Sequence, residues 1–187
     1  MRKCFLSALM ISLLLLTGCG SAQEESKIKE FRAAISESER VSFIAEMHTD
    51  DGEIVADYVL RCTRSGEETV MELLSPELIA GVTARISGKQ ATLDFDGLSF
   101  AAGSIGGEIS PMKVPAVLLD GMEKGSAVQF CRETWEEQDT LTFSVDMGES
   151  TALRIHLDAT SLCPLYGEIS VDGNRIADCR IRDWQME

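Results

Sequence analysis

From Val41 to Trp184 the sequence alternates between apolar and polar residues in short runs, and this pattern restricts the fold more than any other feature. Alternation with a period of two predicts strands that bury one face. Asp-Gly pairs such as Asp96-Gly97 and other turn signals separate the runs, so neighbouring runs are expected to pair as antiparallel hairpins. We count about ten such strands. In the run that begins at Ile54, one face is predicted to carry Ile54, Ala56, Tyr58, Leu60 and Cys62.

Two segments show helical spacing instead. Residues Lys27–Ser38 place Ile28, Phe31 and Ile35 on one side of a predicted helix. A second helix is predicted over Pro111–Lys124, where Gly125 ends it. A short helical turn is expected over Ser75–Gly81, and the glycine-rich stretch Ala101–Ser110 is predicted to be a flexible loop because it lacks the context of a phosphate-binding motif.

The predicted fold is therefore mainly β with two or three helices. A meander of this length must close or curl to hide its edges. The helices would then cover the apolar residues of its concave side. We predict a strongly curved antiparallel sheet, or half-barrel, with helices on the concave side.

The amino terminus has the features of an export signal. Arg2 and Lys3 precede the apolar run Leu6–Leu16, which is too short to span a hydrocarbon core of ~30 Å. The following Leu16-Thr17-Gly18-Cys19 resembles the lipobox of bacterial lipoproteins. The resemblance implies a diacylglyceryl group on the Cys19 sulfur, cleavage before Cys19 and often acylation, for example with palmitate, of the new amino terminus; an uncleaved anchor or a chance cysteine is the alternative.

This interpretation divides the chain into three parts. They are a signal peptide (1–18), a lipidated Cys19 with a tether (19–26) and a single domain (27–187). The predicted location is the extracytoplasmic face of the cell membrane, where two or three acyl chains give a stable anchor.

The charge of the chain limits its partners. It has 31 acidic against 17 basic residues and a net charge of −14, with no basic cluster. Nucleic acid is therefore excluded as an expected partner. Because an anionic membrane surface would repel the domain, the lipid must hold it there. The acidic charge either keeps an exported domain soluble or forms a face for a basic partner.

Four cysteines remain in the predicted domain: Cys62, Cys131, Cys163 and Cys179. Outside the cytoplasm they are candidates for one or two disulfides with three alternative pairings, and four buried free thiols are the other reading. The last predicted hairpin disfavours a Cys163–Cys179 bond, since it places the two at least three residues out of register. No CxxC spacing supports a zinc site.

Catalytic motifs are scarce. The two histidines, His48 and His156, are predicted to be solvated surface residues, and no GxSxG, HExxH or SxxK motif occurs. The acidic groups at 50–53 and 136–139 lack the spacing of a calcium loop and are predicted to be ordinary turns. We predict no enzyme activity, no metal and no cofactor.

The order of elements resembles the LolA/LolB-like superfamily. A lipobox, an acidic tether, a helix that leads into long hairpins and a mid-chain helix between two blocks of strands carry the resemblance, and Ser75–Gly97 is the most similar segment. The resemblance implies a half-barrel with helices as a lid over an apolar cavity. The superfamily's carriers are soluble and use an arginine near the lid that has no counterpart we can map here.

The leading prediction is thus a membrane-anchored lipoprotein that binds a lipid, an acyl group or a lipidated partner in an apolar cavity. The alternative reading of the same residues is a solid core. The second hypothesis is a structural or protein-interaction lipoprotein that docks an envelope complex through a strand edge or its acidic face. The residues predicted to line the cavity are Tyr58, Leu60, Phe95, Val117, Leu118, Met122, Phe130, Phe143 and Ile155.

Overall fold

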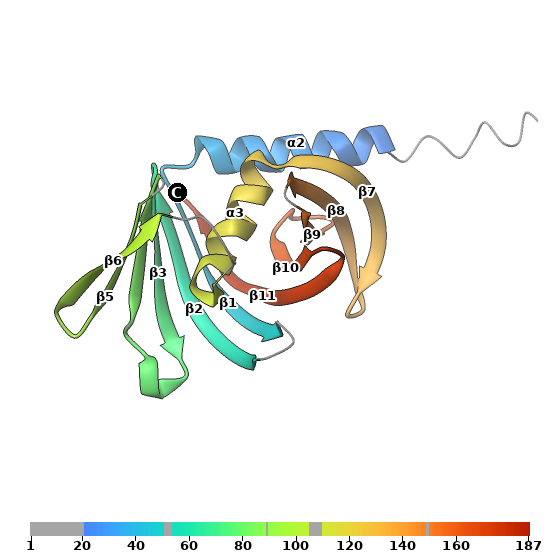
Figure 1. Cartoon of the computed structure of the whole chain (residues 1–187). Coiled ribbons are helices and arrows are strands. Elements are labelled where there is room, and N and C mark those ends of the chain that lie inside the picture. Colours follow the sequence, from blue (N-terminus) through green and yellow to red (C-terminus); the bar gives the residue numbers. More distant parts are fainter. Residues whose placement is uncertain (1–20, 51–53, 89, 105–109, 149) are drawn as a thin grey trace, which may run out of the picture.

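The computed structural model describes residues 21–50, 54–88, 90–104, 110–148 and 150–187. Their strands form one antiparallel sheet of eleven members in the order β6-β5-β4-β3-β2-β1-β11-β10-β9-β8-β7 (Figure 1). The first and last strands pair at its centre, and β6 and β7 are its edges, so the sheet is not closed into a barrel. The strands are β1 (Arg40–Asp50), β2 (Val55–Ser65), β3 (Glu68–Ser75), β4 (Thr83–Ser87), β5 (Gln90–Phe95), β6 (Leu98–Ser104), β7 (Ser126–Trp135), β8 (Gln138–Gly148), β9 (Thr151–Asp158), β10 (Pro164–Val171) and β11 (Asn174–Met186).

The described residues also form two α-helices, α2 (Ser21–Glu37) and α3 (Val114–Lys124), and two 3-10 turns, η1 (Glu77–Ile79) and η2 (Pro111–Lys113). The predicted class, mainly β with few helices and one antiparallel sheet, is confirmed. Neither helix of the described part is long and apolar enough to cross a bilayer.

Two predicted boundaries were wrong. The first helix begins at Ser21 and not at Lys27, so part of the predicted tether is helical. The polar sequence there gave no apolar periodicity, but a helix that packs through its later turns can extend beyond them into solvent. The predicted loop Ala101–Ser110 starts too early, because β6 continues to Ser104; residues 105–109 lie outside the described residues.

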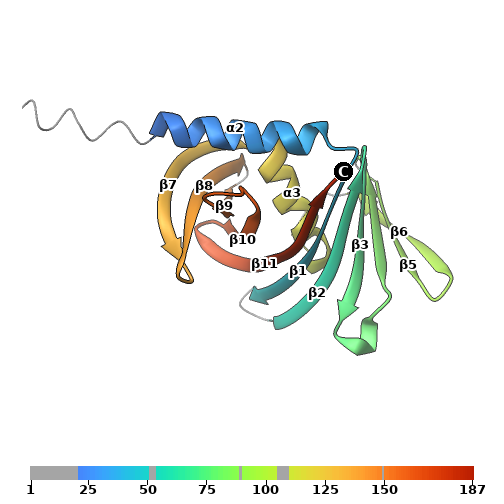
Figure 2. The same cartoon turned by 180° about the vertical axis from the view of Figure 1, so that it is seen from behind.

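Both helices lie on the same side of the sheet. In Figures 1 and 2 the strands bend around α3, and α2 crosses above it. Along β1 the residues at alternate positions from Val41 to Thr49 are buried, which identifies the side of the sheet toward the helices. We call this side the inner face and the opposite side the outer face.

The stripe predicted for the first helix is confirmed, since Ile28, Phe31 and Ile35 are all buried. Polar contacts fix the helix just before this stripe and in its middle. The Lys27 ammonium donates to the carbonyl oxygen of Ala159 (2.8 Å), and the Arg32 guanidinium donates to that of Met122 (3.0 Å). The second contact satisfies a carbonyl in the last turn of α3 and joins the two helices.

Helix α3 contacts β2, β3, β9 and β10. The Arg64 guanidinium on β2 pairs with two carboxylates of α3, Asp120 (2.7 Å) and Glu123 (2.9 Å). The side chains of Arg64 and Glu123 are mostly buried, so this pair is only weakly screened by solvent. Removing one partner would leave the other charge poorly compensated. These ion pairs therefore fix the position of α3 on the sheet.

Glycine allows the helix and the sheet to approach closely. A Cβ atom on Gly167 of β10 would lie 2.8 Å from a terminal methyl of Leu118, and one on Gly121 of α3 would lie 2.1 Å from a methyl of Leu153. Both leucines are fully or almost fully buried. The interface between α3 and the sheet is therefore packed without spare volume.

The four cysteines of the domain are free in the structure, so the predicted disulfides are not formed. Cys179 lies opposite Gly167 in the last hairpin, as the predicted register required. This register keeps Cys163 too far from Cys179 for a disulfide bond. Cys62 and Cys179 are buried, and burial raises the pKa of the Cys62 thiol to about 12. Such thiols stay protonated and act as small apolar groups of the core.

The close approach predicts the effect of Gly167→Ala. The added methyl would force Leu118 out of its position, and we expect a loss of about 1–3 kcal/mol in the free energy of unfolding. Chemical denaturation measures it. In a Leu118→Ala background the clash is removed, so the same substitution should cost little there. A neutral or stabilising Gly167→Ala in the otherwise unchanged chain would contradict the tight packing.

Candidate functional site

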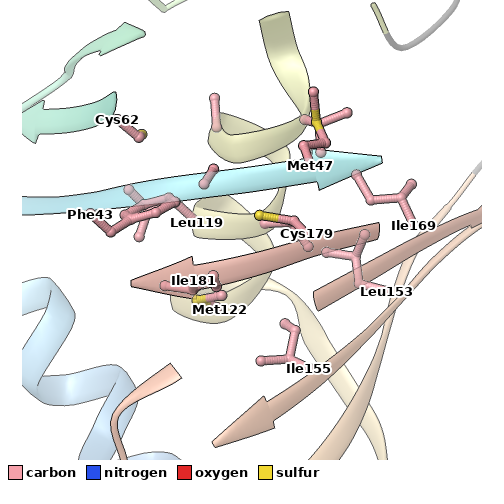
Figure 3. Close-up of a cluster of buried hydrophobic side chains, with 14 of the residues drawn as sticks. Phe43, Met47, Cys62, Leu119, Met122, Leu153, Ile155, Ile169, Cys179 and Ile181 are labelled. Carbon is pink, nitrogen blue, oxygen red and sulfur yellow. The ribbon is translucent and has the colours of Figure 1, made fainter. Parts of the chain in front are cut away.

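Most residues predicted to line an apolar cavity lie instead within one packed cluster. Leu60, Leu118, Met122 and Ile155 expose none of their surface, and Phe143 exposes almost none. Side chains that line a cavity large enough for water would expose part of their surface to it. Figure 3 shows Leu119 and Met122 of α3 among side chains from β1, β9, β10 and β11.

The other four predicted residues are divided between the rim of this cluster and solvent. Tyr58, Val117 and Phe130 are partly buried and pack against the cluster. Phe95 does not join it and is 45% exposed. The structure thus brings eight of the nine residues together as core or rim, and Phe95 belongs to a different surface.

That surface is the hairpin of β5 and β6. Phe95 lies opposite Leu98 in the register, and Leu98 and Phe100 are 60% and 56% exposed. Phe100 in turn lies opposite Leu93, which packs partly against the core. We call Phe95, Leu98 and Phe100 the hairpin patch; it continues the apolar inner face beyond the strands that α3 contacts, at the edge of the sheet (Figure 1).

A hollow of about 480 Å³ lies on the outer face. Its floor consists of outward-facing residues of the central strands, such as Glu46 and His48 of β1, and Trp135 forms a wall at the end of β7. We call it the outer groove. Its lining residues are Glu46, Met47, His48, Asp57, Tyr58, Val59, Trp135, Glu136, Tyr166, Arg175, Asp178 and Arg180. A smaller hollow of about 40 Å³ lies near the start of α2, beside Lys27 and Ala159.

The charged residues of the outer groove are paired with one another or with a neighbour. The His48 imidazole is hydrogen-bonded to the Asp57 carboxylate (2.7 Å), and Arg175 lies 3.6 Å from Asp178. The bond to Asp57 raises the pKa of His48 above its ordinary value. Two more pairs complete the set, Arg180 with Glu136 and Arg182 with Glu46.

Aromatic rings form the far side of the groove. The Trp135 ring stacks on Tyr166 with 5.0 Å between centroids, and the Arg180 guanidinium lies 5.6 Å above the Trp135 ring. Burial raises the pKa of Tyr166 to about 12, so its hydroxyl stays protonated. These contacts hold the wall of the groove in one position.

His156 lies beneath these rings and not in solvent, which corrects the prediction for this residue. Its side chain is 5% exposed, 5.8 Å from the Trp135 ring and 5.4 Å from the Tyr166 ring. Its Nδ1 is hydrogen-bonded to the Thr142 hydroxyl (3.2 Å), whereas its Nε2 is buried without a partner. Burial lowers the pKa of His156, so the neutral ring is favoured. Alternation alone placed it correctly on the outer face but could not show that Trp135 covers it.

The arrangement of these residues is better suited to binding a ligand than to catalysis. Within the described ranges, no three His, Cys, Asp or Glu side chains gather closely enough to hold a metal ion. His48 faces its own carboxylate partner, and His156 is covered by rings. The predicted turn at 136–137 is confirmed between β7 and β8, while residues 51–53 lie outside the described part.

No family model matches the sequence, and no curated protein matches it either. Solved structures show a shared fold. An uncharacterized conserved protein from Thermus thermophilus aligns with a TM-score of 0.54 and 10% identity over 87% of each chain. A DUF1329 family protein from Desulfovibrio piger aligns with a TM-score of 0.52 and 9% identity over 86% of this chain and 91% of its own.

A LolA superfamily protein from Nitrosomonas europaea aligns over 88% of this chain and 93% of its own, with 8% identity and a TM-score of 0.44. The structural neighbours thus include the superfamily that the sequence resembles.

The two histidines are expected to titrate on opposite sides of the ordinary pKa of about 6.5. NMR of the imidazole nitrogens should show His48 above this value and His156 below it. Asp57→Asn should lower the pKa of His48 and leave that of His156 unchanged. Because the folded state disfavours protonated His156, the stability due to this residue is present above about pH 6.5 and is lost as the pH falls below it. Coincident titrations would contradict both assignments.

Proposed function

We propose that this chain is a membrane-anchored, extracytoplasmic lipoprotein without catalytic activity that docks another protein of the cell envelope. The docking surface is the outer edge of β6, which pairs with no further strand among the described residues, together with the hairpin patch. This is the strand-edge form of the second hypothesis drawn from the sequence, and one observation carries it: three large apolar side chains are exposed together on an edge hairpin.

An edge strand offers unpaired backbone donors and acceptors, which a partner strand can use. The patch adds apolar area on the face that is buried elsewhere in the sheet. Soluble proteins rarely expose such groups together unless they bind something there. The other edge strand, β7, differs because α2 contacts it and Val128 is its one strongly exposed apolar residue in the described part.

The proposed anchor favours a protein partner over the membrane itself. Cys19 precedes the first residue of α2 by two positions, so the lipid would hold the amino-terminal end of that helix. Figures 1 and 2 show this end on the side of the molecule away from β5 and β6. A lipid at one end leaves the hairpin patch free to meet a partner at the other.

The lipid-binding function predicted first from the sequence has weaker geometric support. A ligand between the sheet and α3 would have to displace side chains that have no exposed surface. It would also have to break the pairs between Arg64 and the two carboxylates of α3. Such opening costs the buried apolar area as well as the ion pairs. We therefore place the partner at the edge of the sheet.

Site-specific photocrosslinking tests the docking surface. A photoreactive phenylalanine analogue at Leu98 should yield one discrete protein adduct in intact cells. The same analogue at Val128, an equally exposed apolar position on the other edge strand, should yield little. Equal adducts from both positions, or only lipid adducts from Leu98, would argue against docking at β6.

The combined substitution Leu98→Ser and Phe100→Ser separates docking from folding. Because both side chains are mostly exposed, the free energy of unfolding should change by about 0.5 kcal/mol or less. Crosslinking from a photoreactive group at the neighbouring Ser99 should nevertheless be lost. An adduct that survives the double substitution would show that the patch does not hold the partner.

The anchor is tested independently by Cys19→Ala. We expect the unchanged protein to incorporate labelled palmitate in cells and the variant to incorporate none, since Cys19 is the proposed acylation site. The variant should also partition into the aqueous phase of a detergent extraction. Equal labelling of both proteins would place the lipid on another residue. Labelling of neither protein would exclude the lipid anchor.

A further inference from the structure

We propose that the outer groove binds a neutral, polyhydroxylated ligand, namely a short oligosaccharide. This inference goes beyond the proposed docking function and depends on a different surface. The hairpin patch lies on the inner face at β5 and β6, whereas the groove lies on the outer face over β2, β1, β11 and β10. The two can therefore be tested separately.

The size and position of the groove suit a small ligand. Its volume of about 480 Å³ falls within the range of ~300–1,000 Å³ that is typical of small-molecule sites. Its floor is rigid because it is formed by the central strands, where β1 pairs with both β2 and β11. No large rearrangement is needed to form the site.

The charge pattern argues against a charged ligand. The four carboxylates of the lining already have a basic partner, an arginine or, for Asp57, His48; they are Glu46, Asp57, Glu136 and Asp178. A cation would have to compete with these arginines or with His48, and an anion would have to compete with the carboxylates. A hydroxyl group can donate to a carboxylate and accept from a guanidinium at the same time. A ligand with many hydroxyls therefore uses the paired charges as they stand.

The aromatic wall supplies the other half of such a site. A sugar ring presents hydroxyls at its edge and C–H groups on its faces, and the C–H groups can be buried against an aromatic side chain. Trp135 lines the groove and is only partly buried, so part of its surface is available. Its stacking on Tyr166 and its contact with Arg180 fix its position before any ligand arrives.

Trp135 also provides the probe. The chain has two tryptophans, and the other, Trp184, packs against Phe31 and Phe43 on the inner face. Because the buried Nε1 of Trp184 has no hydrogen-bond partner, Trp184→Phe should be tolerated. In this variant the fluorescence reports Trp135 alone.

The experiment titrates the Trp184→Phe chain with two neutral trisaccharides, tri-N-acetylchitotriose and maltotriose. Lysine amide and citrate serve as a cationic and an anionic probe. We expect a saturable change in Trp135 emission with at least one of the sugars and none with the charged probes. The absence of saturation with both sugars, or saturation with a charged probe instead, would overturn the proposal.

A pair of substitutions locates the binding. Asp57→Asn keeps the shape of an exposed side chain but removes a charged acceptor, and we expect it to weaken sugar binding about tenfold. Asp94→Asn is the matched control, because Asp94 pairs with Arg85 outside the groove. Equal effects of the two substitutions would show that the sugar binds elsewhere and would contradict the assignment.

The same chemistry has two sources, a free oligosaccharide and the glycan strands of a cell wall. Sedimentation with insoluble purified cell wall distinguishes them. Pelleting that Asp57→Asn weakens and Asp94→Asn does not would identify the wall glycan. Sugar binding in solution without pelleting would identify a free oligosaccharide. Pelleting that neither substitution changes, without sugar binding in solution, would contradict the groove as the site.

Discussion

The packing of α3 against the inner face of the sheet determines where this protein can bind anything. Glycines at 121 and 167 let the helix approach closely, and Arg64 holds two of its carboxylates. The contact fills the space in which the sequence predicted an apolar cavity. The main contacts of α3 toward β6 are with β2 and β3, however, and the hairpin of β5 and β6 keeps exposed apolar side chains. The packed interface beneath α3 and the exposed apolar side chains of β5 and β6 thus both follow from the position of α3.

The outer face follows a different physical rule. It carries many charged side chains, and these pair across neighbouring strands, as Arg61 and Glu72 or Arg85 and Asp94 show. Exposed pairs of this kind add little stability, but each one compensates a carboxylate of a strongly acidic chain. This pattern changes next to the turn between β7 and β8, where Trp135 covers His156 and Tyr166. The rings give the outer groove an aromatic wall. The two proposed binding surfaces therefore differ in chemistry as well as in position.

Much of the fold could be predicted from the sequence because period-two alternation and turn residues act locally. The strands, the stripe at Ile28, Phe31 and Ile35, and the register of the last hairpin were all predictable for this reason. The candidate sites were not. The groove joins residues from five strands and a turn, and only the pairing of β1 with β11 brings them together. An apolar core and the wall of a cavity also have the same composition, so Leu60 and Leu118 could not reveal which of the two they form.

Native mass spectrometry with a bacterial lipid extract tests the central claim most directly. The chain from residue 20 onward would be incubated with the extract, separated from free lipid and weighed intact. A filled interface between α3 and the sheet predicts the mass of the bare polypeptide. A discrete added mass that extracts as lipid, and that the combined Leu98→Ser and Phe100→Ser variant retains, would show that α3 opens. It would contradict the claim that the interface between α3 and the sheet is closed to ligands.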